Sequence, residues 1–327
     1  MRRISNGSAW GADVRILVTG ASGFVGHAVV ERLAADPRDL ILAASRRPPG
    51  LLAKRVEWVQ MGDLAAGAAW NESLDDIRVV VHTAARVHVM HDTAADPLAE
   101  FRRVNVDGTL ALARRAHASG VSRFIFLSSI KVNGEGSQRG RPFRADDPPQ
   151  PVDPYGLSKL EAERALLALG AQTGMEIVII RPVLVYGRGV RGNFRSLIEW
   201  VRRGVPLPFG GIDNRRSFVA LDNLADLIGT CVRHPAASGT WLVSDGDDVS
   251  TPELLRRVAG AMSVRLRLMP VPPACLRALG VLAARVDQME RLCGDLQVDI
   301  GPARGLLGWV PPISMRDALA LAFAADG

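Results

Sequence analysis

The chain has 327 residues, of which 48% are hydrophobic and 23% charged, and its net charge is +6. This composition is typical of a globular protein and excludes a disordered or collagen-like chain. The three cysteines (Cys231, Cys275 and Cys293) form no CxxC pair, which argues against a disulfide framework or a zinc knuckle and favours a cytoplasmic protein.

The basic excess does not indicate a nucleic-acid-binding protein. Arginines are scattered along the chain, lysine occurs only at positions 54, 131 and 159, and no recognised binding module is visible. No run of 18 apolar residues exists, so we expect no membrane span, and residues 276–286 read as an amphipathic helix. Residues 1–12 lack an apolar run and are predicted to be an N-terminal extension, not a secretory signal.

Strand and helix patterns alternate through the first half of the chain. The predicted strands cover residues 14–19, 40–45, 56–61, 79–83, 123–128 and 176–181. The predicted helices cover residues 26–35, 96–119 and 154–169. This alternation predicts an α/β fold, a Rossmann-type doubly wound parallel sheet that binds a dinucleotide, over residues 13–185.

The pattern changes after Tyr186. Glycines and prolines cluster between residues 187 and 211, which predicts loops over a site in place of further strand–helix units. Helices are predicted over residues 222–232 and 251–262 with a strand over 240–244 between them, so part of 220–246 is expected to return to the Rossmann domain. The remainder of residues 186–327 is predicted to form mainly a smaller mixed α/β lobe that binds the substrate.

A glycine-rich turn follows the first predicted strand. Its glycines are Gly20, Gly23 and Gly26, with Ser22, Phe24 and Val25 between them. Gly20 permits a tight turn, Gly23 lets the backbone approach a pyrophosphate, and Gly26 lets the helix pack closely on the sheet. The free N–H groups at the start of the helix complete a phosphate-binding site.

The end of the second strand distinguishes between the two nicotinamide coenzymes. An acidic residue there is typical of NAD-binding proteins, but this chain has Ser45, Arg46 and Arg47. Arginine suits a 2′-phosphate, so NADP(H) is favoured while NAD(H) stays open. Asp63 and Leu64, after the third strand, are placed to hold the adenine.

Tyr155 and Lys159 are four residues apart and so share one face of a predicted helix. A lysine beside a tyrosine lowers the pKa of the phenol, which could then exchange a proton with a carbinol oxygen at neutral pH. Ser128 and Ser129 end a strand at the sheet edge where such folds bind ligands, and one of them could hydrogen-bond the carbonyl.

Together these residues resemble the extended short-chain dehydrogenase/reductases, in particular the branch of nucleotide-sugar epimerases, dehydratases and reductases. The resemblance covers nearly all of the chain after Asp13. It rests on the glycine turn, on Tyr155 with Lys159, and on the segments 62–64, 82–85, 105–109, 128–129 and 181–187.

The resemblance implies roles for further residues. Ser129 is the catalytic serine. Thr83, Ala84, Ala85, Pro182 and Val183 border the nicotinamide, and Asn105 supports the active site. Arg216 occupies the place of an arginine that clasps the substrate diphosphate, although Ser217 replaces the usual aspartate beside it. Asn193 and Arg291 resemble the family's other diphosphate contacts. Lys131 departs from the residue that many sugar epimerases carry, and it is also expected to contact the substrate.

The resemblance leaves several reactions open. An Asp-Glu pair after the catalytic serine would indicate a 4,6-dehydratase, but Ile130 and Lys131 stand there. Reduction of a 4-keto sugar linked to a nucleotide diphosphate fits Arg46 and Arg47, and the segments 129–134 and 290–294 resemble reductases of surface-polysaccharide synthesis that act on UDP-linked sugars. The alternative is an NAD-dependent UDP-hexose 4-epimerase.

Three further expectations complete the interpretation. A non-catalytic NADP(H)-binding sensor is the remote alternative, because such proteins lack the Tyr/Lys pair. We expect no metal site, since His82, His88 and His91 have no carboxylates to complete one. The family also implies a homodimer through residues 96–119 and 154–169.

Overall fold

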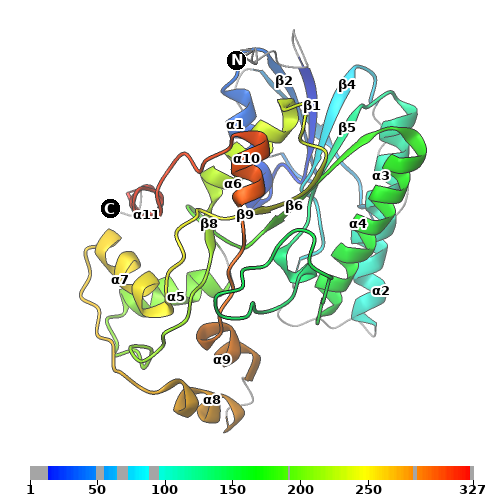
Figure 1. The fold of residues 1–327 in the computed structure, drawn as a ribbon. Coiled ribbons are helices and arrows are strands. Elements are labelled where there is room, and N and C mark those ends of the chain that lie inside the picture. Colours follow the sequence, from blue (N-terminus) through cyan, green and yellow to red (C-terminus); the bar gives the residue numbers. More distant parts are fainter. Residues whose placement is uncertain are drawn as a thin grey trace, which may run out of the picture.

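The computed structural model describes residues 14–48, 55–64, 73–87, 96–190, 192–282 and 286–324, without the side chains of residues 193 and 286–288. Its centre is a seven-stranded parallel sheet (Figure 1). In sheet order the strands are β3 (Val56–Gln60), β2 (Asp39–Ser45), β1 (Val14–Thr19), β4 (Ile77–His82), β5 (Arg123–Leu127), β6 (Glu176–Pro182) and β9 (Gly239–Val243). The strand order reverses at β1, so the carboxyl ends of β1 and β4 flank the position where doubly wound folds bind ligands.

Two layers of helices bury the sheet. One hydrophobic cluster joins it to α1 (Phe24–Ala34), α6 (Leu221–Arg233) and α10 (Gly301–Leu307). A second cluster joins the opposite face to α3 (Thr109–Ala118) and α4 (Pro154–Thr173). The strands are nearly continuous apolar runs because both faces are covered. The predicted Rossmann-type α/β class is therefore confirmed.

The long helix predicted over residues 96–119 is interrupted. It consists of α2 (Pro97–Arg102), a π-helical turn η2 (Arg103–Gly108) and α3. Single π-turns inside helices occur frequently at functional sites. Hydrophobic periodicity did not reveal this turn.

A third hydrophobic cluster forms a smaller lobe below the sheet in Figure 1. Its two-stranded parallel sheet consists of β7 (Leu184–Tyr186) and β8 (Phe218–Ala220). Its helices are α5 (Asn193–Arg202), α7 (Thr251–Ala261), α8 (Pro273–Leu282), α9 (Val286–Cys293) and α11 (Met315–Phe323).

Helix α5 corrects the expectation of loops throughout residues 187–211. Phe194, Leu197, Ile198 and Val201 are buried on one face of this helix, with the spacing of an amphipathic helix. The glycines and prolines around the segment had outweighed this pattern. The strand β9 pairs with β6, as the expected return of residues 220–246 to the sheet requires, while the exact domain boundaries stay a prediction.

Candidate active site

The glycine turn between β1 and α1 is shaped by close backbone approaches. Gly20 has a φ of 73°, and a Cβ there would lie 2.7 Å from the backbone nitrogen of Ala84. A Cβ on Gly26 would lie only 2.1 Å from the carbonyl oxygen of Gly20. Gly23 caps α1 without a side-chain hydrogen bond to the first turn, so the N–H groups of that turn are directed at the space beside the glycines. These features fit a pyrophosphate.

Ser45 at the end of β2 uses its hydroxyl within the protein. The group donates to the carbonyl oxygen of Arg47 at 2.5 Å and accepts from Nε1 of Trp58 at 3.1 Å. Arg46 and Arg47 are exposed. The structure therefore gives Ser45 the role of shaping this turn, and the two arginines are the groups that could reach a 2′-phosphate. After β3, Asp63 is exposed and Leu64 is buried.

His82 is a structural residue at the end of β4. Its Nδ1 lies 2.7 Å from Oγ1 of Thr19, and its Nε2 lies 3.0 Å from Oγ1 of Thr109. Burial, with a smaller contribution from the charge of Lys159, lowers the pKa of His82 to about 3. The ring is therefore neutral at pH 7. Its two hydrogen bonds connect β4 to β1 and to α3, just before the loop formed by residues 83–87.

Asn105, in the π-helical turn, connects that loop to the helix bearing Tyr155. Its carboxamide accepts from the backbone N–H of Arg86 at 2.8 Å and donates to the carbonyl oxygen of Arg86 at 3.0 Å. It also donates to Oγ of Ser158 at 3.0 Å. Asn105 therefore fixes the segment after β4 against α4.

Ser129 follows β5 and caps the short helix η3 (Ile130–Val132), accepting from the N–H of Lys131 at 3.3 Å. Helix α4 begins close to this segment because Gly156 has no side chain. A Cβ on Gly156 would lie 2.9 Å from the carbonyl oxygen of Lys131. This approach brings the start of α4, with Tyr155, beside the Ser129 segment.

Lys159 is buried one turn after Tyr155. Its Nζ donates to the carbonyl oxygen of Leu127 at 2.8 Å and lies 4.4 Å and 5.9 Å from the ring centroids of Phe126 and Tyr155. Burial lowers the pKa of Lys159 to about 7, although the charge of Glu163 acts in the opposite direction. The structure therefore unites Tyr155, Lys159 and the strand end that bears Ser129.

The ionisation expected for Tyr155 needs correction. In this structure burial raises the pKa of Tyr155, and the charge of Asp153 raises it further. The neighbouring lysine does not overcome the desolvation of the phenolate. Tyr155 is therefore protonated at neutral pH, as a proton donor to a carbonyl oxygen must be. The positive charge of an oxidised nicotinamide is the remaining influence that could ionise it.

A buried polar network below the site escaped the sequence reasoning. Arg181 pairs with Glu163 through two hydrogen bonds of 2.9 and 2.6 Å, and it donates to Oδ1 of Asn133 at 2.9 Å. Glu163 also accepts from Ser128. Ser128 therefore belongs to this network, whereas Ser129 caps η3, and the contact of Ser129 with a substrate stays a prediction. The signal was available, since Glu163 lies four residues after Lys159 on the same helical face.

Pro182 ends β6 and Val183 follows it, both of them buried. The residues named so far that follow β1, β4, β5 and β6 therefore meet at one edge of the sheet, the carboxyl edge. The predicted coenzyme residues and the three predicted catalytic residues share this edge.

Arg216 is held at the junction with the smaller lobe. Its Nη1 donates to the carbonyl oxygen of Gly294 at 2.9 Å, and burial lowers its pKa to about 10. Ser217, which replaces the usual aspartate, still connects this segment to its surroundings. Its hydroxyl donates to Asp248 and accepts from the N–H of Val298 at 3.1 Å. Arg291 lies near Arg216 and pairs with Glu135.

Lys131, which is expected to contact the substrate, is paired within the protein. Its ammonium bonds to Asp153 and lies 3.1 Å from Glu135, so two carboxylates already compensate its charge. The side chain of Asn193, like His88, His91 and the extension over residues 1–12, lies outside the part that the structure describes.

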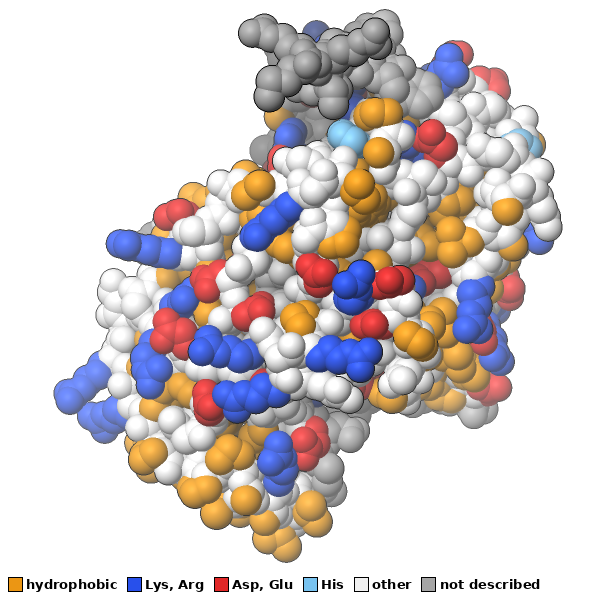
Figure 2. Space-filling model, viewed as in Figure 1, with side chains coloured by type: hydrophobic (Ala, Val, Ile, Leu, Met, Phe, Trp, Pro, Cys, Tyr) orange, Lys and Arg blue, Asp and Glu red, His pale blue; other side chains and the backbone are white. Residues whose placement is uncertain are grey.

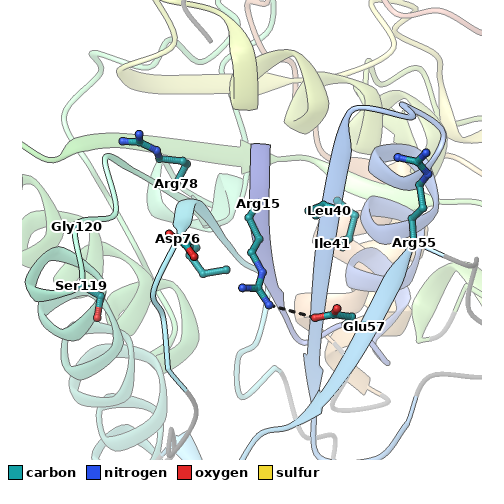
Figure 3. Close-up of a pocket in the computed structure, with 10 residues that line it drawn as sticks. Arg15, Leu40, Ile41, Arg55, Glu57, Asp76, Arg78, Ser119 and Gly120 are labelled. Carbon is teal, nitrogen blue, oxygen red and sulfur yellow. Dashed lines mark hydrogen bonds and ion pairs between the residues drawn. The ribbon is translucent and has the colours of Figure 1, made fainter. Parts of the chain in front are cut away.

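A cavity of about 710 Å³ lies at the opposite edge of the sheet (Figure 3). Its lining includes Arg15, which faces Glu57 at 3.2 Å, and two arginines, Arg55 and Arg78, that point away from this pair. None of the predicted site residues lines it, and we assign it no part in the chemistry.

Across the face shown in Figure 2, acidic side chains are interleaved with the arginines, in agreement with the scattered charge of the sequence. Within the described ranges, no cluster of three metal-binding side chains occurs. None of the helices described there is both long and apolar enough to cross a membrane.

Comparison with known proteins adds the following. Residues 16–243 match the model of the NAD dependent epimerase/dehydratase family. A Vibrio cholerae protein named UDP-glucose 4-epimerase is 47% identical over 308 residues, covering 92% of each chain. GDP-6-deoxy-D-mannose reductase of Pseudomonas aeruginosa is 27% identical, covering 93% of this chain and 94% of its own. The structure of MoeE5 with UDP-glucose and NAD is 26% identical, with a TM-score of 0.73 over 95% of this chain and 97% of that one.

Proposed function

Because the chain belongs to the NAD-dependent epimerase/dehydratase family, we propose that it acts at C4 of a UDP-linked hexose, and that 4-epimerisation is the reaction. The observation that carries the proposal is the placement of Tyr155 and Lys159 on one face of α4, next to the strand end that bears Ser129. The sequence alone favoured reduction of a 4-keto sugar. The relative at 47% identity favours the epimerase alternative instead.

Each catalytic side chain has a task in this proposal. When bound, NAD would supply a hydride acceptor for C4 of the sugar and would return the hydride to the opposite face of the 4-keto sugar, so the net redox change would be zero. The positive charge of oxidised NAD would favour ionisation of Tyr155, and the tyrosinate takes the proton of the C4 hydroxyl and later gives it back. Ser129 orients the oxygen by hydrogen bonding, while Lys159 holds the coenzyme ribose and stabilises the tyrosinate electrostatically.

The turn formed by Gly20, Gly23 and Gly26 supports binding of a dinucleotide, because a side chain at Gly20 or Gly26 would collide with backbone. Asp63 and Leu64 are proposed to flank the adenine, and residues 83–85 with 182–183 are proposed to flank the nicotinamide. In an epimerase the coenzyme stays bound between turnovers, and NAD is the form we propose with that reaction.

A 4-ketoreductase using NADPH is the second candidate. The specific observation in its favour is that Arg46 and Arg47 are exposed after β2, where an acidic residue would otherwise select NAD. The relative at 27% identity named GDP-6-deoxy-D-mannose reductase also supports a reductive reaction. The intact Tyr155–Lys159 pair argues against a non-catalytic sensor.

The test is to denature the purified protein and identify any released nucleotide by mass spectrometry, alongside incubation of the native enzyme with UDP-glucose. Retained NAD and conversion to UDP-galactose without added coenzyme would support the epimerase. A protein that contains no nucleotide, prefers NADPH and leaves UDP-glucose unchanged would instead favour the reductase.

We further propose a homodimer through α2, α3 and α4. These helices form one layer, in which Arg102 of α2 pairs with Glu161 of α4 through hydrogen bonds of 2.8 and 2.6 Å. Light scattering behind a sizing column gives the mass directly, and a mass near 35 kDa would overturn this proposal.

A further inference from the structure

Glu135 lies between two cations at the junction of the lobes. Its carboxylate accepts from Nε and Nη2 of Arg291 at 3.1 and 3.3 Å, and one of its oxygens lies 3.1 Å from Nζ of Lys131. The side chains of Lys131, Glu135 and Arg291 are 22%, 28% and 32% exposed, respectively. The carboxylate therefore occupies the guanidinium fork of Arg291, which is the geometry that a phosphate would adopt there.

The second partner of Glu135 is itself anchored. Lys131 also bonds to Asp153, which caps α4 by accepting from the N–H of Gly156 at 2.6 Å. If Arg291 turned to another anion, Glu135 would therefore keep one cationic partner, and Lys131 would keep two anionic ones. The pair between Glu135 and Arg291 can be exchanged without leaving a charge alone.

Arg216 adds a second positive charge near Arg291 and Glu135, which favours binding of an anion there. Within its guanidinium, Nη1 donates to the carbonyl oxygen of Gly294. Arg216 is half-buried, and its guanidinium interacts electrostatically with Glu135, Asp295 and Arg291. A half-buried guanidinium that still has N–H groups free for an anion binds a phosphate more strongly than a fully hydrated one does.

We propose that Glu135 is an internal competitor for the substrate diphosphate. In the empty site it pairs with Arg291, and a diphosphate displaces it toward Lys131 while binding Arg291 and Arg216. This role rests on the proposed function, because it assumes a nucleotide-diphosphate sugar. Its consequence is weaker binding and faster release of the nucleotide product than the two arginines alone would give.

The experiment measures UDP affinity by calorimetry and UDP dissociation by stopped flow. Removing one nearby negative charge with Glu135→Gln should tighten UDP binding about 5- to 50-fold and slow its dissociation. The amide can still accept from Lys131, so the local fold is expected to persist. Unchanged or weaker UDP binding by Glu135→Gln would overturn the proposal, since it would mean that Glu135 merely orients Arg291.

Glu290→Gln is the matched control. Glu290 is adjacent to Arg291 in α9, but it pairs with Arg277 at 3.0 Å. Glu290→Gln removes the same charge beside Arg291 and should change UDP affinity less than about twofold. A tightening equal to that of Glu135→Gln would indicate a general change of potential and would overturn the specific role of Glu135.

Inorganic pyrophosphate separates this proposal from the proposed function. If the wild type neither binds nor converts UDP-sugars, but Glu135→Gln still tightens pyrophosphate binding, the proposed function fails while Glu135 still competes with a diphosphate for the arginines. If UDP-glucose is converted but Arg291→Met leaves UDP affinity unchanged, the diphosphate lies elsewhere and the competitor role fails alone.

Discussion

The ammonium of Lys159 donates to the carbonyl oxygen of Leu127 at 2.8 Å, which ties the helix carrying Tyr155 to the end of the strand that precedes Ser129. One buried hydrogen bond thus sets the distance between the two elements that supply the catalytic residues. It also explains why a lysine is retained in a buried position at the cost of a lowered pKa.

Tyr155→Phe should lower turnover about 10²–10⁴-fold, because it removes the group that exchanges the proton with the C4 oxygen. Coenzyme binding should stay nearly unchanged, as checked by fluorescence titration. The other tyrosine of the chain provides the control. Tyr186 bonds to Asp245 at 2.7 Å in the smaller lobe, so Tyr186→Phe should affect stability more than turnover. Near-normal turnover in Tyr155→Phe would contradict the assigned role.

Lys159→Met should change how stability depends on pH. The pKa of Lys159 is about 7 in the folded protein, below its value of 10.5 in the unfolded chain. Its charge therefore destabilises the fold fully below pH 7, and the penalty fades as the pH rises from 7 toward 10.5.

Urea unfolding of the coenzyme-free protein measures this effect. Between pH 7.5 and 9.5 the wild type should gain roughly 2–3 kcal/mol relative to Lys159→Met. The loss of the hydrogen bond to Leu127 changes the free energy of unfolding of Lys159→Met by the same amount at every pH, so it does not affect the pH dependence. A difference that does not vary with pH would show that Lys159 keeps an ordinary pKa.

Gly26→Ala should abolish coenzyme binding and destabilise the fold by at least about 1–3 kcal/mol, because the new Cβ would meet the carbonyl oxygen of Gly20 at 2.1 Å. Gly260→Ala is the control, since a Cβ at this position in α7 meets nothing within 4 Å. There the substitution should stabilise the protein by about 0.4–1 kcal/mol. Equal thermal shifts for the two variants would refute the close approach at Gly26.

Glu163→Gln should destabilise the protein by about 3–5 kcal/mol, because it leaves the buried guanidinium of Arg181 without its counter-charge. Glu161, on the same helix, pairs with Arg102 in a more exposed position. Glu161→Gln should cost less than about 1 kcal/mol. Chemical denaturation measures the free energy of unfolding of both variants. A small loss of stability in Glu163→Gln would mean that the network does not support the site structurally.

Most of the sheet could be predicted from the sequence, because buried parallel strands are short apolar runs and the helices between them keep their periodicity. The segment of α5 was missed because its apolar spacing lies among glycines and prolines. The turn η2 was missed because a π-helical turn inside a helix changes no residue pattern.

The site was predictable where spacing alone brings groups together, as for Tyr155 and Lys159. It was less predictable where the hydrogen-bond or ion-pair partner of a side chain depends on the tertiary structure. Ser45 bonds to Arg47 and Trp58, and Lys131 bonds to carboxylates at positions 135 and 153. The pKa of Tyr155 likewise depends on burial, which the distance between two residues along a helix does not reveal.

The most direct test of C4 chemistry follows the hydrogen on C4 itself. The enzyme, without added coenzyme, is incubated with UDP-glucose carrying deuterium at C4, and the sugar products are analysed by NMR and mass spectrometry. The account predicts UDP-galactose that retains the deuterium at C4, because the hydride leaves and returns without meeting solvent, and it predicts almost none of this product with Tyr155→Phe. Loss of the deuterium to water, or equal conversion by Tyr155→Phe, would contradict it.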